Sequence, residues 1–408
     1  MTKLAIASLL VVTAYIASAS SSRPLGSLHA HTDNIEKVIN DGSNVTTTAN
    51  KKLRVRHLIR HKAGKTKSKK KGISSKSSKS SKSSKTSKAT VDYWKMADLR
   101  ESANPYAIGH RGFGATDDSG VLDGIPTENT IDSVLAAFDV GARVVEIDVV
   151  LTADGNAFVD HDDFLADFSC INQMTTDDLK QVLPESTTLF ELLKIVQPYA
   201  RRRNIDADPS GLVIIDVKTP SPLCDPNDDT EEELMKAVVY DIQKARMTEQ
   251  VEIQSYSPVL LVLAHSLAPE IPRALLLNAI QFLTPEQTED ATGLSVTLIE
   301  KGDNPDIQWA EIGQLFRLPG YASFEQFVFT AATTVVATTV SIDKLFLGQA
   351  EQTVTGSGAG IVAGLQSQGF TVHGWTAQST DEWLFLQQLG VDGIFTDLVA
   401  EGIDLQAD

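Results

Sequence analysis

The pattern that most limits the fold of this chain is a long alternation of two kinds of segment. From residue 91 onward, short apolar runs rich in β-branched residues alternate with amphipathic stretches of helical periodicity. Such alternation predicts parallel strands connected by helices, and its extent favours a closed (β/α)8 TIM barrel. The expected strands are residues 106–110, 144–150, 157–159, 212–217, 251–253, 273–277, 335–341, 371–375 and 393–395. The expected helices include residues 130–140, 189–199, 231–245 and 381–389.

The connection between the second and third expected strands is too short to hold a helix. Asp154 and Gly155 stand in this interval and are typical of a tight turn. A crossover between parallel strands needs many more residues. The barrel is therefore expected to be irregular between its second and third strands.

Reactive side chains stand at or near the ends of several expected strands. They are His110, Glu146, Asp148, His161, Asp216 and Lys218. Because the carboxyl ends of the strands in a barrel meet at one rim, we expect these side chains to share one pocket.

The acidic residues of this set predict a site for a hard cation. Glu146 and Asp148 are two residues apart on one strand, so both carboxylates lie on the same side of it. With Asp216 as a third oxygen ligand they favour Mg²⁺ or Ca²⁺. Zn²⁺ fits less well, because the two cysteines lie in loops and no histidine pair has ligand spacing. The alternative is a metal-free network in which a carboxylate pairs with Arg111 or Lys218.

The two histidines at the strand ends suggest acid–base chemistry. A pair of imidazoles can take a proton from a nucleophile and return one to a leaving alkoxide near neutral pH. Taken singly, each of His110 and His161 is more typical of a polar residue at the rim than of a catalytic residue. Beside Arg111, whose planar guanidinium suits phosphate, and beside the acidic residues, the pair suggests phosphoryl transfer.

Ordered motifs in the chain resemble those of glycerophosphodiester phosphodiesterases. The first are Ile108-Gly109-His110-Arg111-Gly112, Glu128-Asn129-Thr130, Glu146-Ile147-Asp148-Val149, Leu151-Thr152-Ala153-Asp154-Gly155 and His161-Asp162. The later ones are Ile214-Ile215-Asp216-Val217-Lys218, Gln254-Ser255-Tyr256, Gly374-Trp375-Thr376 and residues 390–397. The resemblance implies a barrel that hydrolyses small-molecule glycerophosphodiesters to glycerol phosphate and an alcohol with a divalent cation.

The resemblance also implies a role for each site residue. His110 and His161 correspond to the acid–base pair, Glu146, Asp148 and Asp216 to metal ligands, and Arg111 and Lys218 to phosphate-binding residues. Glu128 is expected behind the site, since the Asn-Thr pair that follows it suits a helix start. Trp375 is expected to line the substrate pocket, with a place in the core as the alternative.

This sequence departs from the family pattern at positions that bear on the identity of the substrate more than on the type of reaction. The family usually has Glu where Asp216 stands, and residues 279–334 match poorly, as a lid or an inserted element would. One alternative is a phospholipase D-like enzyme acting on lysophospholipid or sphingolipid, with the apolar residues 324–336 as its lipid-facing rim. The other is a non-catalytic protein that binds polyanions or a cell wall through its basic arm.

The first ninety residues are expected to lie outside the barrel. Residues 1–19 read as a secretory signal, because Lys3 and an apolar run precede small residues suited to cleavage, and no stretch is long enough to span a membrane. Residues 20–90 are expected to be a disordered basic arm, with 16 Lys or Arg and no acidic residue between 51 and 88. The arm suits a polyanionic surface, although without aromatic residues for base stacking no specific nucleic acid is expected.

The remaining residues, 91–408, are assigned to the barrel of a secreted protein. Residues 89–408 hold 17 basic and 50 acidic side chains, so this part is strongly acidic. Its only cysteines, Cys170 and Cys224, follow the strands that carry His161 and Lys218. They form either one disulfide between two loops of the site or two buried thiols.

Overall fold

The computed structural model describes residues 93–101, 105–115, 125–201, 211–221, 224–225, 230–277, 324–352 and 358–407. The predicted secretory signal (1–19) and basic arm (20–90) lie outside these residues and stay predictions. Most of the poorly matching stretch, up to residue 323, lies outside them as well.

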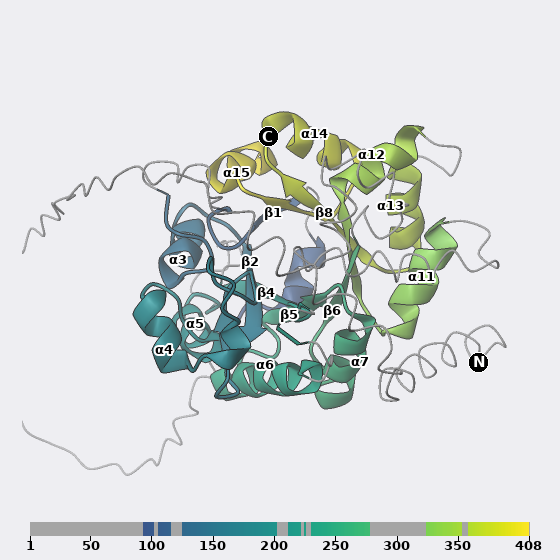
Figure 1. Cartoon of the computed structure of the whole chain (residues 1–408). Helices are drawn as coiled ribbons and strands as arrows, with labels where there is room; N and C mark the ends of the chain where they lie inside the picture. The colour runs from purple at the N-terminus through teal and green to yellow at the C-terminus, as the bar shows by residue number, and fades with distance from the viewer. Residues whose placement is uncertain are drawn as a thin grey trace, which may run out of the picture. The chain divides into compact units, whose positions relative to one another are not determined.

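Within the described residues, eight parallel strands form a closed barrel. In order around it they are β1 (Tyr106–Gly109), β2 (Val144–Leu151), β4 (Leu212–Val217), β5 (Val251–Ser255), β6 (Arg273–Leu277), β7 (Thr339–Asp343), β8 (Thr371–Ala377) and β9 (Gly393–Thr396). Because β1 pairs with both β2 and β9, the sheet has no free edge. The predicted TIM barrel is confirmed (Figure 1).

The short strand β3 (Ala157–Val159) does not join the barrel wall. It pairs antiparallel with the end of β2, and β2 pairs on its other side with β4. The turn between β2 and β3 is held by Asp154, whose carboxylate accepts hydrogen bonds from Thr152 Oγ1 at 2.7 Å and Asn156 Nδ2 at 3.0 Å. Gly155 supplies the positive φ of 75° that this turn needs. The predicted irregularity is therefore a hairpin that extends beyond the rim.

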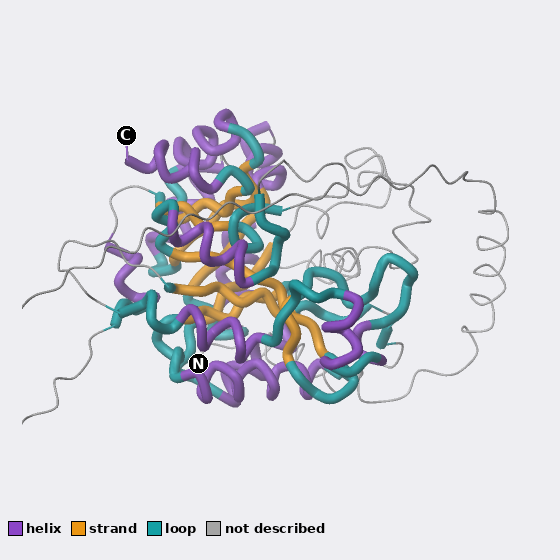
Figure 2. Tube along the Cα trace, turned by 90° about the vertical axis from the view of Figure 1, so that its left-hand side faces the viewer, coloured by secondary structure: helices purple, strands orange, loops and turns teal. Residues whose placement is uncertain are grey.

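Apart from η1 (Met96–Glu101), whose Met96 and Leu99 join the apolar cluster inside the barrel, the helices lie around the barrel and its β2–β3 hairpin (Figure 2). The other described helices are α3 (Ile131–Asp139), η2 (Ile171–Gln173), α4 (Thr176–Val182), α5 (Leu189–Val196), α6 (Glu231–Ala245), α7 (Pro258–Leu267), α11 (Phe324–Thr334), α12 (Lys344–Gln352), α13 (Gly358–Ser367), α14 (Thr380–Leu389) and α15 (Val399–Ala407). Several start where a side chain caps the first turn, as at Thr130 and Thr188. The main core lies between these helices and the outward side chains of the strands.

One predicted strand begins later than expected. Residues 335–338 precede β7, because α11 continues to Thr334 and Val336 adopts a positive φ of 54°. Val328, Ala332 and Val335 are buried in the main core. Within the apolar stretch 324–336 these three side chains therefore face the barrel, whereas Phe329 and Val336 are exposed, and the lipid-facing rim stays a prediction.

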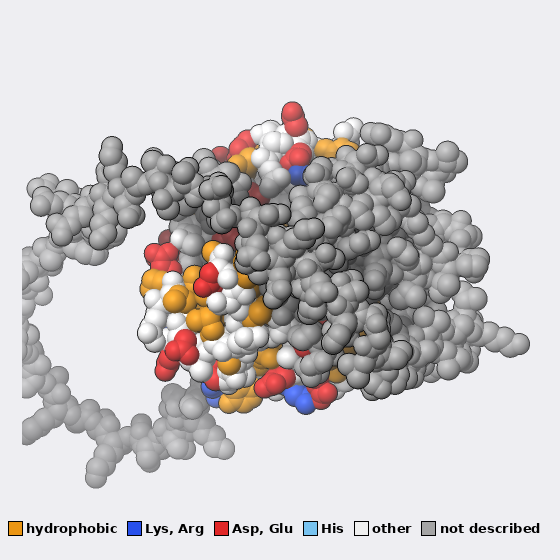
Figure 3. All heavy atoms as spheres, in the orientation of Figure 1, with side chains coloured by type: hydrophobic (Ala, Val, Ile, Leu, Met, Phe, Trp, Pro, Cys, Tyr) orange, Lys and Arg blue, Asp and Glu red, His pale blue; other side chains and the backbone are white. Residues whose placement is uncertain are grey.

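The acidic composition of residues 89–408 is visible on one face of the molecule (Figure 3). On the face seen in Figure 3, Asp and Glu side chains outnumber Lys and Arg among the coloured atoms. None of the helices in the described ranges combines the length and apolarity needed to cross a bilayer.

Candidate active site

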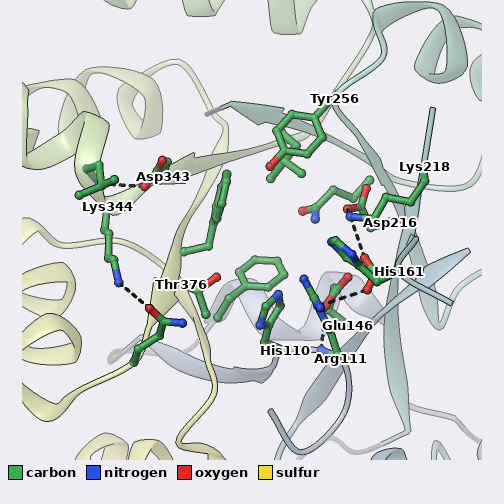
Figure 4. Close-up of a pocket in the computed structure, with 17 residues that line it drawn as sticks. His110, Arg111, Glu146, His161, Asp216, Lys218, Tyr256, Asp343, Lys344 and Thr376 are labelled. Atoms are coloured by element: carbon green, nitrogen blue, oxygen red, sulfur yellow. Dashed lines mark hydrogen bonds and ion pairs between the residues drawn. The ribbon is translucent and has the colours of Figure 1, made fainter. Parts of the chain in front are cut away.

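The carboxyl ends of the barrel strands open into a cavity of about 290 Å³ (Figure 4). Side chains from most of the predicted site line it: His110, Arg111, Glu146, Asp148, His161, Asp216, Lys218 and Trp375. Glu128 stands behind this lining, where its Oε1 accepts a hydrogen bond from Arg111 Nη1 at 2.7 Å. The structure thus brings together all the residues that the sequence assigned to the chemistry, from strands far apart in the chain.

The alternation of side chains along β2 and β4 places three carboxylates in the barrel interior. Inward-facing Val144 and Ile214 belong to an apolar cluster inside the barrel, and the next inward positions toward the rim are acidic. These are Glu146, Asp148 and Asp216, here called the acidic cluster. All three residues are buried, and each offers an oxygen within 4.8 Å of the others.

Two cationic side chains contact the acidic cluster. Lys218 Nζ lies 2.9 Å from Asp148 Oδ1 and 2.8 Å from Asp216 Oδ2. Arg111 Nε lies 3.5 Å from Asp148 Oδ2, and its guanidinium also pairs with Glu128. The ion network considered as an alternative is therefore present. Among the described residues, however, it sets two cations, Arg111 and Lys218, beside four carboxylates, which are Glu128 and the three of the acidic cluster.

The repulsion among these carboxylates affects mainly Glu146. Burial raises the pKa of this carboxyl well above its usual value, and the charges of Asp148 and Asp216 raise it further. Burial opposes ionisation of Asp148 too, yet Lys218, His161 and Arg111 together hold the pKa of Asp148 well below its usual range. A divalent cation would relieve this repulsion, and three buried carboxylates are the donor set that Mg²⁺ and Ca²⁺ prefer. The residues present fit such an ion.

His110 is oriented by a carboxylate from the last strand. Its Nδ1 lies 2.7 Å from Asp397 Oδ1, just after β9. Asp397 also accepts hydrogen bonds from the Ala115 amide at 2.9 Å and from Gln378 Nε2 at 3.1 Å. Although burial alone would raise it, the pKa of Asp397 is lowered by the contact with His110. With Nδ1 engaged, Nε2 is the nitrogen left for proton exchange in the cavity.

His161 is carried to the cavity by the β2–β3 hairpin. The Asp160 amide donates to the Asp148 carbonyl at 3.2 Å, which fixes the hairpin against the strand that holds the acidic cluster. His161 Nδ1 then lies 2.7 Å from Asp162 Oδ1. Burial raises the pKa of Asp160 to about 7. In Figure 4, His110 and His161 both lie at the same cavity, so the two imidazoles do not face apart.

Asn129 is a site residue that the sequence interpretation did not assign. Its Nδ2 donates to Asp148 Oδ2 at 2.8 Å, and its Oδ1 accepts from the Asp148 amide at 3.0 Å. These two bonds fix the rotamer of the carboxylate at the centre of the acidic cluster. The motif Glu128-Asn129-Thr130 pointed to this position, but only a helix cap could be derived from it.

The opposite side of the cavity is largely aromatic. Trp375 and Tyr256 make an edge-to-face contact with ring centroids 6.1 Å apart, and both line the cavity beside Leu276. Trp375 therefore belongs both to the cavity wall and to a small apolar cluster. Figure 4 shows Asp343 and Lys344 across the cavity from Asp216 and Lys218.

The two cysteines form a disulfide in this structure, with Cα atoms 5.4 Å apart. The bond joins the loop after His161 to the loop after Lys218. Asn172 strengthens this junction by donating to the Cys224 carbonyl at 2.8 Å.

Loss of the disulfide is expected to destabilise the barrel more than it impairs chemistry. The bridge closes a segment with a sequence separation of 54, which corresponds to about 4 kcal/mol of unfolding free energy in the chain-entropy account. The double variant Cys170→Ala/Cys224→Ala should lose about this amount in denaturant unfolding. Reductant should destabilise the parent protein and leave the variant unaffected; equal stability of parent and variant would contradict a formed bridge.

Comparisons with known proteins agree with this geometry. The model of the glycerophosphoryl diester phosphodiesterase family matches residues 110–401, a span that contains every candidate catalytic and metal residue. No curated protein matches the chain significantly. A solved structure from Silicibacter pomeroyi, assigned as a glycerophosphoryl diester phosphodiesterase, is 20% identical with a TM-score of 0.55 and covers 78% of this chain and 98% of its own. One from Galdieria sulphuraria, assigned as a glycerophosphodiester phosphodiesterase, is 17% identical with a TM-score of 0.50 and covers 74% and 98%. At these identities the two structures show the shared fold.

Proposed function

Because the chain belongs to the glycerophosphoryl diester phosphodiesterase family, we propose that it hydrolyses glycerophosphodiesters to glycerol phosphate and an alcohol, with His110 and His161 as the acid–base pair. The observation that carries the proposal is the arrangement of these imidazoles at one cavity. Each is held at Nδ1 by a carboxylate 2.7 Å away. Each therefore keeps its other nitrogen for a proton transfer.

The proposed reaction exchanges one P–O bond for another. One imidazole takes the proton of the attacking hydroxyl, which belongs to water or to the substrate itself. The other donates a proton to the leaving alkoxide as its bond to phosphorus breaks. A cyclic phosphate formed by a substrate hydroxyl is then opened by water with the two roles exchanged, so both routes end in the same products.

Arg111 and Lys218 are proposed to hold the phosphate oxygens. Both line the cavity and both already contact Asp148, so they lie between the acidic cluster and the space for substrate. The planar guanidinium of Arg111 suits two oxygens of a phosphate, whereas Lys218 offers a compact point charge. Burial lowers the pKa of Arg111, but the negative charges of Asp148 and Glu128 raise it by more. The pKa of this guanidinium therefore lies above its usual value.

The acidic cluster is proposed to hold Mg²⁺ or Ca²⁺. A bound dication would neutralise charge that develops on the phosphate oxygens. Asn129 and Lys218 prepare Asp148 for this role by fixing its two oxygens. Asp216 is shorter by one methylene than the Glu that the family usually has there, and Lys218 holds its Oδ2 at 2.8 Å.

The direct test is turnover of a substrate panel. Purified protein with Mg²⁺ or Ca²⁺ is expected to release glycerol phosphate from glycerophosphocholine, glycerophosphoethanolamine and glycerophosphoinositol, measured with a coupled dehydrogenase. The panel also contains lysophosphatidylcholine and sphingomyelin. Cleavage of these lipids alone would favour the phospholipase D-like alternative, and no turnover at all would favour a non-catalytic binding protein. A His110→Ala protein purified in parallel excludes a contaminating enzyme.

A further inference from the structure

A chain of buried polar side chains crosses the barrel interior and ends at the cavity. Tyr106 Oη lies 2.6 Å from His373 Nε2, His373 Nδ1 lies 3.5 Å from Ser341 Oγ, and Ser341 Oγ donates to Gln254 Oε1 at 2.8 Å. The four residues come from β1, β8, β7 and β5, and each is at most 2% exposed. Of the four, only Gln254 lines the cavity.

One glycine leaves space for Tyr106 and His373, the two residues of this hydrogen-bonded series that lie farthest from the cavity. The rings of Tyr106 and His373 meet edge to face with centroids 5.6 Å apart. A Cβ atom at Gly393 would lie 2.7 Å from Tyr106 Cε2 and 3.0 Å from His373 Cδ2. Because Gly393 has no side chain, both rings fit beside it.

The donors and acceptors of these hydrogen bonds can be assigned in one consistent order, from Tyr106 to Gln254. The single proton of the Ser341 hydroxyl goes to Gln254 Oε1, so the Ser341 oxygen accepts from His373 Nδ1. A neutral imidazole protonated at Nδ1 then accepts from the Tyr106 hydroxyl at Nε2. At the cavity end, the carbonyl of the Gln254 amide accepts from Ser341, and among the described residues no hydrogen bond takes up its NH₂ group.

The charge of the cavity favours the same orientation of the amide. Gln254 is the strand partner of Asp216, a member of the acidic cluster. An amide that turned its carbonyl oxygen to the cavity would add a partial negative charge beside the carboxylates of the acidic cluster. The donor end of the amide suits both those carboxylates and an anionic substrate.

We propose that Gln254 binds the substrate by donating a hydrogen bond from Nε2 to a non-bridging oxygen of the phosphodiester. Ser341 and His373 are positioning residues, which act on the substrate only by holding the amide in this orientation. The assignment rests on the proposed function, because it requires a phosphodiester in the cavity. It adds to Arg111 and Lys218 a neutral donor that contributes no charge to the cluster.

Kinetics of three single variants and one double variant test the assignment. Gln254→Leu should lower kcat/KM about 10- to 100-fold, the usual effect of losing a hydrogen bond to a charged group. Gln254→Glu should lower it at least as far, because a carboxylate would face the phosphate. Ser341→Ala should lower it about 3- to 10-fold, and should cause no further loss in the Gln254→Leu background, as expected for residues that act as one unit.

A matched control lies one layer deeper on the same two strands. Thr339 Oγ1 donates to Glu252 Oε2 at 2.6 Å, and neither residue lines the cavity. Thr339→Val removes a buried hydroxyl comparable to that of Ser341. It should lower the unfolding temperature and leave kcat/KM within about twofold of the parent value.

Binding of glycerol 3-phosphate, measured by calorimetry on the same proteins, separates this inference from the proposed reaction. A loss of affinity of about 10-fold in Gln254→Leu supports the assignment whatever diester the enzyme turns over. Unchanged affinity and kcat/KM in Gln254→Leu would overturn it. Additive effects of Ser341→Ala and Gln254→Leu, near-parent activity of Gln254→Glu, or a kinetic loss in Thr339→Val equal to that in Ser341→Ala would overturn it as well.

Discussion

Replacement of His161 by alanine is expected to lower kcat for glycerophosphodiester hydrolysis about 10²- to 10⁴-fold, the range typical for loss of a general acid or base. The imidazole lines the cavity and is held at Nδ1 by Asp162, so its removal takes away one of the two proposed proton-exchanging groups. The effect should appear mainly in kcat, because Arg111 and Lys218 remain to bind phosphate. Stopped-time assays of product release with the purified variant measure it.

A second histidine provides the matched control for this variant. His265 lies on the outer helix α7, away from the cavity. His265→Ala should retain the parent kcat while it reports any general cost of losing an imidazole. If His161→Ala and His265→Ala turned over substrate at the same rate, the assignment of His161 to acid–base catalysis would be wrong.

Removal of divalent cations is expected to lower activity at least about 100-fold, since a metal at a phosphoryl group supplies several kcal/mol of stabilisation. In the absence of the ion the substrate anion would lie beside the three carboxylates of the acidic cluster. Addition of Mg²⁺ or Ca²⁺ should restore the rate. The measurement is kcat/KM after chelation and dialysis, followed by titration with each ion.

Two substitutions test in the same experiment whether the acidic cluster, and not any other carboxylate, determines the dependence of activity on the ion. Glu146→Gln should raise the ion concentration needed for half-maximal activity, because it removes one of the three buried oxygen ligands. Asp241→Asn, on the outer helix α6, should leave that concentration unchanged. Full activity of the parent protein after chelation would show that the cluster works without a metal.

Period-two alternation along the strands predicted which carboxylates point inward. Glu146 and Asp148 share a face of β2 with Val144, and Asp216 shares a face of β4 with Ile214. Strand ends likewise predicted that His110 would reach the same rim. These features follow from local geometry, so they can be derived from residues close together in the chain.

Contacts that depend on closure of the barrel could not be predicted in this way. Asp397 holds His110 although 287 positions separate them in the chain. The link from Ser341 to Gln254 spans 87 positions and depends on how far one side of the barrel is shifted relative to the other. That shift is a property of the whole sheet, and no single segment encodes it. Likewise, Val335 and Val336 favour a strand locally, but they form a turn between α11 and β7, in which Val335 is buried and Val336 adopts a positive φ of 54°.

The contact between β1 and β9 has a consequence for the timing of activity during synthesis. The first and last barrel strands lie side by side, and one supplies the imidazole while the other leads to its carboxylate partner. A nascent chain that has emerged only as far as α14 holds both histidines but lacks Asp397. Phosphodiesterase activity should therefore arise only after β9 and Asp397 have left the ribosome, which makes the activity a biochemical signal for closure of the barrel.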